Sequence, residues 1–178
     1  MQCLKVNDYI EKIKESFHGS DEEILSFFKG LREAHYKGKM LWALGNGGSL
    51  AVAQHFAQDM IKAAGIRVQA VSCPSIITAF SNDDGFEYSY FNALSVLSSE
   101  MDPIIIFSCS GNSRNYIEFV SGFGNRKNPI YSIVGTNGGF LKEKSNKCIH
   151  IKSNNYQICE SAFQITADII VNLFQEDK

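Results

Sequence analysis

Hydrophobic and polar positions follow two alternating patterns along the chain. Short apolar runs have the length of strands buried on both faces, and they predict strands at about 40–44, 66–72, 103–107, 129–134 and 147–151. Apolar residues at helical spacing predict helices at 6–18, 21–36, 50–64, 86–97 and 156–176, with shorter ones ending near 122 and 144. This order predicts an α/β fold, a three-layer α/β/α sandwich whose parallel sheet of about five strands is covered on both sides.

The two predicted helices before the sheet are expected to form a helical hairpin within a single domain over residues 1–178. Residues 1–37 then pack on the domain or in an oligomer interface. The last predicted helix has apolar residues on more than one face, which is typical of a buried helix. We expect it to pack against the N-terminal pair or a second subunit, and we therefore expect a homo-oligomer.

Composition and charge exclude several classes of protein. A chain of 178 residues with 44% hydrophobic and 20% charged residues is ordinary for one soluble globular domain. A net charge of −2 without a basic run argues against nucleic-acid binding. No apolar stretch reaches the ~18 residues of a membrane span, and the segment 1–5 lacks a signal-peptide core, so we expect a cytoplasmic protein. The dispersed cysteines predict reduced thiols rather than disulfides or a zinc cluster; they are Cys3, Cys73, Cys109, Cys148 and Cys159.

A glycine turn joins the first predicted strand to the helix that follows it. Gly45, Gly47 and Gly48 allow a sharp turn that exposes backbone N–H groups, and Ser49 stands where an N-cap belongs. The positive end of the helix faces this turn, which favours a phosphate ligand, although a tight connection without a ligand is the alternative. A Walker A loop is excluded by the absence of Lys after Gly48, and a dinucleotide fingerprint is disfavoured because Leu50 stands where glycine is needed.

A second turn of small and hydroxyl-bearing residues, 108–113, follows the most apolar predicted strand. Both turns then lie at the carboxyl ends of parallel strands, where open α/β sheets bind ligands. Neither turn carries a lysine, so hydroxyl and amide groups suit one phosphate monoester better than a triphosphate with magnesium. The polar cluster 81–85 either only makes a turn or brings Asp83 into the same cleft, and the spacing leaves both open.

At 45–49, 55–57, 81–83 and 108–113 the chain resembles the sugar isomerase (SIS) domain family, and within it the phosphoheptose isomerases. These convert sedoheptulose 7-phosphate into glycero-manno-heptose 7-phosphate for lipopolysaccharide or capsule synthesis. The resemblance covers nearly the whole chain and implies a flavodoxin-like fold, a cytoplasmic homotetramer and active sites between subunits.

The resemblance also implies roles for particular residues. It places phosphate at the serines of the two turns, with Asn46 and Asp83 near the sugar, while Cys109 stands where the isomerases usually have threonine. The candidate phosphate and substrate residues are Asn46, Gly47, Gly48, Ser49, Asp83, Ser108, Cys109, Ser110, Asn112 and Ser113.

In the resembling isomerases a divalent metal, often zinc, is held by a His and a Glu on the first helix of the fold core and a Gln and a His on the last helix. Here His55 is kept, Asp59 replaces the Glu, and Glu160 and Asp168 fall at the Gln and His positions. Each replacement can ligate a metal, and three carboxylates on an apolar background would repel one another without a cation. The alternative is that all three are solvated helix residues.

Two functions follow from these residues. The first is aldose–ketose isomerisation of a sugar phosphate through an enediol, with Asp59 as principal base, Asp168 as its partner, and His55 and Glu160 mainly holding a metal. The second is a non-catalytic SIS-domain protein that binds a sugar phosphate as a sensor or adaptor. The second predicts binding without turnover.

Overall fold

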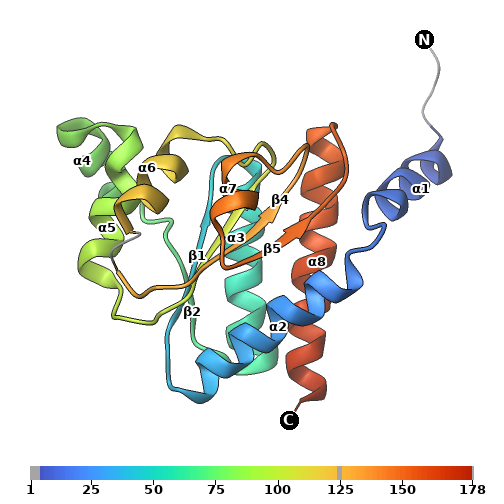
Figure 1. Ribbon diagram of the computed structural model, residues 1–178, viewed down its shortest axis with the longest axis horizontal. Coiled ribbons are helices and arrows are strands. Elements are labelled where there is room, and N and C mark those ends of the chain that lie inside the picture. Colours follow the sequence, from blue (N-terminus) through green and yellow to red (C-terminus); the bar gives the residue numbers. More distant parts are fainter. Residues whose placement is uncertain (1–4, 124–125, 178) are drawn as a thin grey trace.

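The computed structural model describes residues 5–123 and 126–177, so Cys3 lies outside the described residues (Figure 1). Its centre is one parallel sheet in the order β2-β1-β3-β4-β5. The strands are β1 (Leu41–Gly45), β2 (Val68–Ala70), β3 (Ile104–Ser108), β4 (Ile130–Val134) and β5 (Lys147–His150). The predicted α/β sandwich with five parallel strands is confirmed.

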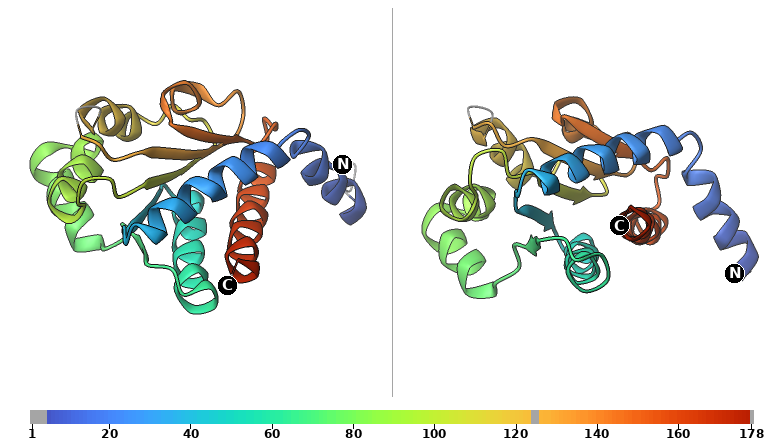
Figure 2. Two further views of the ribbon diagram at one scale, coloured as in Figure 1. Left: turned by 60° about the horizontal axis from the view of Figure 1, so that its bottom comes forward. Right: turned by 90° about the horizontal axis from the view of Figure 1, so that it is seen from below.

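Helices cover both faces of the sheet, as Figure 2 shows from two further directions. They are α1 (Val6–Ser16), α2 (Asp21–Tyr36), α3 (Gly48–Asp59), α4 (Pro74–Asp84), α5 (Ser89–Leu97), α6 (Arg114–Phe123), α7 (Gly139–Lys144) and α8 (Tyr156–Glu176). Alternate side chains of each strand enter opposite layers, as when Leu41 joins the core under α2, α3 and α8 while Trp42 joins the core under α4 to α7. The sheet is therefore buried on both faces.

Three local expectations need correction. The predicted helical hairpin is open: α1 packs against α8 and turns away from α2 instead of folding back along it (Figures 1 and 2). Of the cluster 81–85, residues 81–84 form the last turn of α4, where the Ser81 hydroxyl donates to the Ile77 carbonyl (2.6 Å), and only Gly85, at φ +97°, makes the turn. Short π and 3-10 segments, Met60–Ala64 and Phe86–Tyr88, extend α3 and precede α5.

The strand order places a topological switch between β1 and β3. These strands pair in parallel, with Gly45 opposite Phe107 at their carboxyl ends. The chain leaves β1 toward α3 on one face and leaves β3 toward α6 on the other, so a crevice opens between the two connections. The two predicted phosphate turns are thereby brought side by side.

No helix in the described ranges combines the length and the hydropathy that crossing a membrane requires. The four cysteines that the structure describes are free thiols, of which Cys109 and Cys159 are buried. The other two differ in exposure, because Cys73 is exposed and Cys148 is partly buried.

Candidate active site

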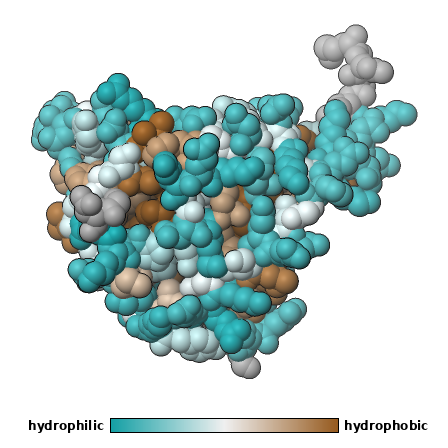
Figure 3. Space-filling model, in the orientation of Figure 1, coloured by the Kyte–Doolittle hydropathy of each residue, from teal (hydrophilic) through white to brown (hydrophobic). Residues whose placement is uncertain are grey.

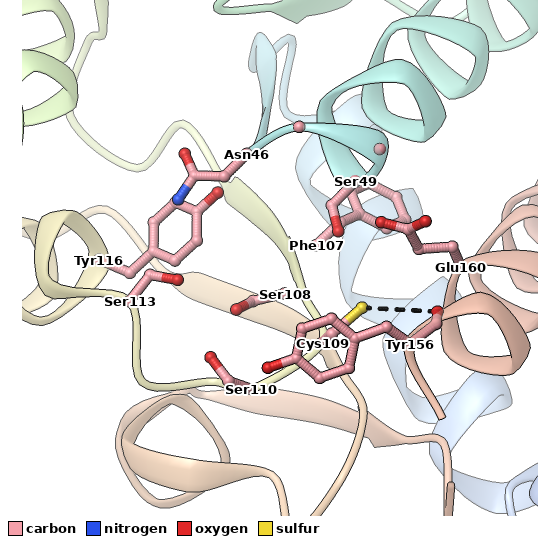
Figure 4. Close-up of a pocket in the computed structure, with 12 residues that line it drawn as sticks. Asn46, Ser49, Phe107, Ser108, Cys109, Ser110, Ser113, Tyr116, Tyr156 and Glu160 are labelled. Atoms are coloured by element: carbon pink, nitrogen blue, oxygen red, sulfur yellow. Dashed lines mark hydrogen bonds between the residues drawn. The ribbon is translucent and has the colours of Figure 1, made fainter. Parts of the chain in front are cut away.

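A cavity of about 330 Å³ lies at the carboxyl ends of β1 and β3 (Figure 4). Both predicted turns contribute to its wall, and α8 closes one side. The lining residues are Asn46, Gly47, Gly48, Ser49, Phe107, Ser108, Cys109, Ser110, Ser113, Tyr116, Tyr156 and Glu160. Eight of the twelve are among the residues that the sequence predicts for phosphate or substrate, and Glu160 is among the predicted metal ligands.

The turn between β1 and α3 depends on glycine at three positions. Gly47 has φ +54°, and a Cβ atom on Gly45 would overlap the backbone of Ser49. A Cβ atom on Gly48 would meet the carboxylate of Glu160, so the missing side chain lets α8 bring an acid against the start of α3. The turn is therefore shaped by close approaches of backbone and side chain.

Ser49 is not the N-cap that the sequence predicts. The helix α3 begins at Gly48 with Gly47 as its cap, so Ser49 lies within the first turn, nearly buried at the cavity wall. Its N–H donates to the carbonyl of Asn46 (3.1 Å). The Ser49 N–H is therefore already used within the turn, which leaves the Ser49 hydroxyl and the positive end of α3 available to an anion.

The turn after β3 presents serine hydroxyls whose oxygens accept bonds from the turn itself. Ser108 Oγ accepts from the N–H of Gly111 and Ser110 Oγ from that of Asn112, each at 3.1 Å. A hydroxyl that accepts one bond still carries its own proton. Both serines can therefore donate to an anion in the cavity.

A pair of amides ties the first turn to α6. Asn46 and Asn115 donate to each other through their side chains, both at 3.0 Å, and Asn115 is buried. Beside them, the Tyr90 hydroxyl donates to the carbonyl of Gly45 at 2.5 Å. These contacts fix Asn46 and the end of β1 relative to the second turn.

Cys109 lies where the resemblance expects a threonine hydroxyl. Its hydrogen bond with Cys159 and its burial raise the pKa of the Cys109 thiol, while the same hydrogen bond lowers the pKa of Cys159 to about 7. Cys109 therefore stays a neutral thiol at neutral pH and adds no negative charge to a site that would hold a phosphate.

Two predicted substrate residues, Asp83 and Asn112, are not among the residues that line the cavity. Asp83 is exposed on α4 and accepts from the side chain of Asn82 (2.9 Å). Asn112 is exposed, and its side chain accepts from the N–H of Phe140 at the start of α7 (2.8 Å). Within one subunit Asn112 thus supports the turn from outside, and Asp83 faces solvent.

The predicted metal ligands are spread along α3 and α8. His55 Nε2 and Asp59 Oδ2 on α3 are 3.2 Å apart, Glu160 stands at the cavity beside Gly48, and Asp168 is exposed with its carboxylate bonded to Gln164 (2.7 Å). Among the residues described, no three His, Cys, Asp or Glu side chains lie together as a metal site. His55 and Asp59 can share one ion, but the predicted four do not form one ligand set within a subunit.

The sequence did not single out three lining residues as part of the site, namely Phe107, Tyr116 and Tyr156. Tyr116 had a usable signal, because it follows Ser113 by three residues at the start of a predicted helix and so lies on the same face. Phe107 ends an apolar strand, and Tyr156 begins α8 far along the chain. The position of Tyr156 depends on how α8 packs.

Comparisons with known proteins give a consistent result. No protein-family model matches the chain. The phosphoheptose isomerase of Geobacter metallireducens is 34% identical over 126 residues, which cover 67% of each chain, and that of Aneurinibacillus thermoaerophilus is 28% identical with 96% of this chain and 94% of the relative covered. The solved phosphoheptose isomerase of Neisseria gonorrhoeae superposes with a TM-score of 0.88 at 23% identity, covering 96% and 94% of the two chains. The structural similarity shows that the fold is shared. The sequence identity of 34% to the first relative shows that the two chains are homologous.

Proposed function

The chain belongs to the phosphoheptose isomerase family, and we propose that it converts sedoheptulose 7-phosphate into glycero-manno-heptose 7-phosphate. The observation that carries the proposal is the cavity between β1 and β3, where four serines converge from two turns; they are Ser49, Ser108, Ser110 and Ser113. Among the described lining residues Glu160 alone carries a charge, and no lysine or arginine lines the cavity. Neutral donors and a helix N-terminus suit one monoester phosphate.

The proposed reaction moves one proton between neighbouring carbons. A carboxylate takes a proton from C1 of the ketose, the carbonyl oxygen at C2 gains a proton, and the resulting enediol is reprotonated at C2 as the C1 hydroxyl becomes the aldehyde. We propose Asp59 as the base and Asp168 as its partner, as the sequence predicts. General acid–base catalysis of this kind contributes about 10²–10⁴-fold to a rate.

The positions of these acids favour a site shared between subunits. Asp59 lies eleven residues beyond Gly48, which is about 16 Å along the axis of α3. Asp168 lies eight residues beyond Glu160, about 12 Å along α8. Within one subunit both acids are thus distant from the serine turns, whereas a neighbouring copy can bring its acids to the sugar.

Exposed apolar side chains support assembly into a homo-oligomer, with a tetramer favoured by the resemblance. Val6 and Ile10 on α1 are 75% and 53% exposed, Val96 on α5 is 82% exposed, and α4 buries none of its described residues. Figure 3 shows apolar side chains at the surface over the region of α4, α5 and α6. Light scattering on the purified protein tests this, and a monomer at micromolar concentration would contradict it.

We also propose that the protein acts in the cytoplasm. Free thiols at Cys73, Cys109, Cys148 and Cys159 suit a reducing compartment. Cell fractionation with an antibody against the protein tests the location.

Metal binding stays a prediction of the resemblance. The described side chains offer His55 and Asp59 as a pair, and the proposed proton transfer uses the protein's own carboxylates. Calorimetric titration with zinc tests the prediction. Loss of zinc binding in His55→Ala would support it, whereas equal binding by that variant and the wild type would contradict it.

An NMR assay with sedoheptulose 7-phosphate, with and without added zinc or manganese, tests the function as a whole. Conversion to the aldoheptose phosphate is the expected result. Binding of the sugar phosphate without turnover would contradict the isomerase and support the adaptor function instead. If the protein neither bound nor converted sedoheptulose 7-phosphate, the proposal of a sugar-phosphate site would be wrong.

A further inference from the structure

Tyr116 carries a hydroxyl without a hydrogen-bond partner at the cavity. Its side chain is fully buried, and it lines the cavity between the two turns. Across the ranges that the structure describes, no group donates to or accepts from this hydroxyl. Because an unpaired buried polar group is costly, such a hydroxyl indicates a partner that the isolated chain does not supply.

The position of the Tyr116 ring is fixed by its neighbours. Its N–H donates to the carbonyl of Ser113 (2.9 Å), and its ring stacks on that of Tyr90 with centroids 5.9 Å apart and planes 8° from parallel. Figure 4 shows the hydroxyl directed toward the side of the cavity where Asn46 lies. The group is therefore held in place before any ligand arrives.

The hydroxyl is a donor at neutral pH. Burial and the neighbouring Tyr90 and Cys109 raise the pKa of Tyr116 well above its ordinary value. A protonated phenol donates one hydrogen bond, and the oxygens of a sugar phosphate are acceptors. The chemistry of the unpaired group thus matches the proposed ligand.

We propose that Tyr116 donates its O–H to an oxygen of the bound sugar phosphate and is a substrate-binding residue of this site. The inference rests on the proposed function, since it needs a sugar phosphate in the cavity. Tyr116 then adds a hydroxyl from the first turn of α6 to those of the four lining serines. It selects for ligands with an acceptor at that point, because any other ligand leaves the hydroxyl unpaired.

The test compares Tyr116→Phe with Tyr131→Phe. Tyr131 is also a buried tyrosine, but it lies on β4, packs against Phe27 and does not line the cavity. Isothermal titration with sedoheptulose 7-phosphate is expected to show about tenfold weaker binding for Tyr116→Phe and unchanged binding for Tyr131→Phe. The melting temperature of ligand-free Tyr116→Phe should equal or exceed that of the wild type, because the variant loses an unpaired buried hydroxyl.

A second titration with inorganic phosphate locates the contact. Weaker phosphate binding by Tyr116→Phe puts the accepting oxygen on the phosphoryl group, and unchanged phosphate binding puts it on the sugar. Equal binding of sedoheptulose 7-phosphate by Tyr116→Phe and the wild type would overturn the inference while leaving the proposed function standing. Wild-type protein that does not bind the sugar phosphate would overturn both.

Discussion

The serine turns and the predicted acid positions differ in how far a single chain assembles them. The turns after β1 and β3 meet in one cavity because their strands are neighbours in the sheet. His55, Asp59 and Asp168 lie along α3 and α8 outside the residues that line this cavity. The proposed phosphate site is therefore complete within one subunit, whereas the proposed proton transfer depends on what packs against the two helices.

The largest expected effect separates proton transfer from binding. Asp59→Asn should lower turnover of sedoheptulose 7-phosphate by about 10²–10⁴-fold, because an amide cannot accept the proton. The dissociation constant should change little, since the proposed phosphate contacts come from the serine turns and not from Asp59. NMR turnover and calorimetry measure the two quantities. Glu160→Gln serves as the comparison. If Glu160→Gln lost turnover while Asp59→Asn kept full activity, the base would be Glu160 in the cavity and not Asp59.

Alkaline pH is expected to destabilise the turn region. Burial raises the pKa of Tyr90 to about 12, above the ordinary value of 10. Below pH 10 both the folded and unfolded states keep this proton. Between pH 10 and 12 the unfolded state loses it first, so the free energy of unfolding falls by up to roughly 3 kcal/mol. Denaturant unfolding at several pH values measures the slope.

The matched variant for that experiment is Tyr90→Phe. It loses the bond to Gly45 and therefore starts less stable, but its free energy of unfolding should decline less steeply above pH 10. The tyrosines Tyr116 and Tyr131 and the thiols of Cys109 and Cys148, whose pKa values are also raised, remain in the variant and contribute to the residual slope. An unchanged slope would show that Tyr90 does not contribute.

Removing one serine hydroxyl should weaken phosphate binding about tenfold, because hydrogen bonds to charged groups are worth roughly 1.5–3 kcal/mol. Ser49→Ala is the most informative variant, since Ser49 is nearly buried and lines the cavity. Ser121→Ala, exposed on α6, is the control. Titration with inorganic phosphate measures both, and equal affinities would mean that the turns do not hold the anion.

The smallest expected effect concerns the amide pair between the turns. Asn115→Ala should raise the KM for the sugar phosphate about three- to tenfold, because Asn46 loses its two bonds to Asn115. If Asn115 acts through Asn46, the same substitution should add little in an Asn46→Ala background. Additive effects in the double variant would instead indicate a general loss of packing.

The sequence predicted elements with strong periodicity better than the contacts between them. The bounds of α2 and α8 match the expected ranges, because both helices carry a long run of apolar residues at helical spacing with polar residues at each end. The sequence favours a turn at 81–85 because Asn, Asp and Gly favour turns, yet the first four of these residues continue α4 and only Gly85 leaves the helix.

Within the site, residues in the two turns were predictable because strand order alone brings them together. Glu160 was predicted only as a metal ligand, and its contact with Gly48 depends on how α8 packs. Tyr116 was missed because an aromatic residue at the start of an amphipathic helix usually belongs to the core. Its side chain is indeed buried, and only the unpaired hydroxyl distinguishes it.

The interior position of β1 in the sheet, with a strand on each side, has a consequence for how such a protein can change. β1 is bonded to β2 on one side and β3 on the other, so the backbone that leads into the first turn has little freedom to shift. A different sugar is then accommodated by replacing side chains that line the cavity, such as those at 46, 113 and 116, over an unaltered scaffold. A few substitutions at these positions are then enough to change which sugar the protein prefers.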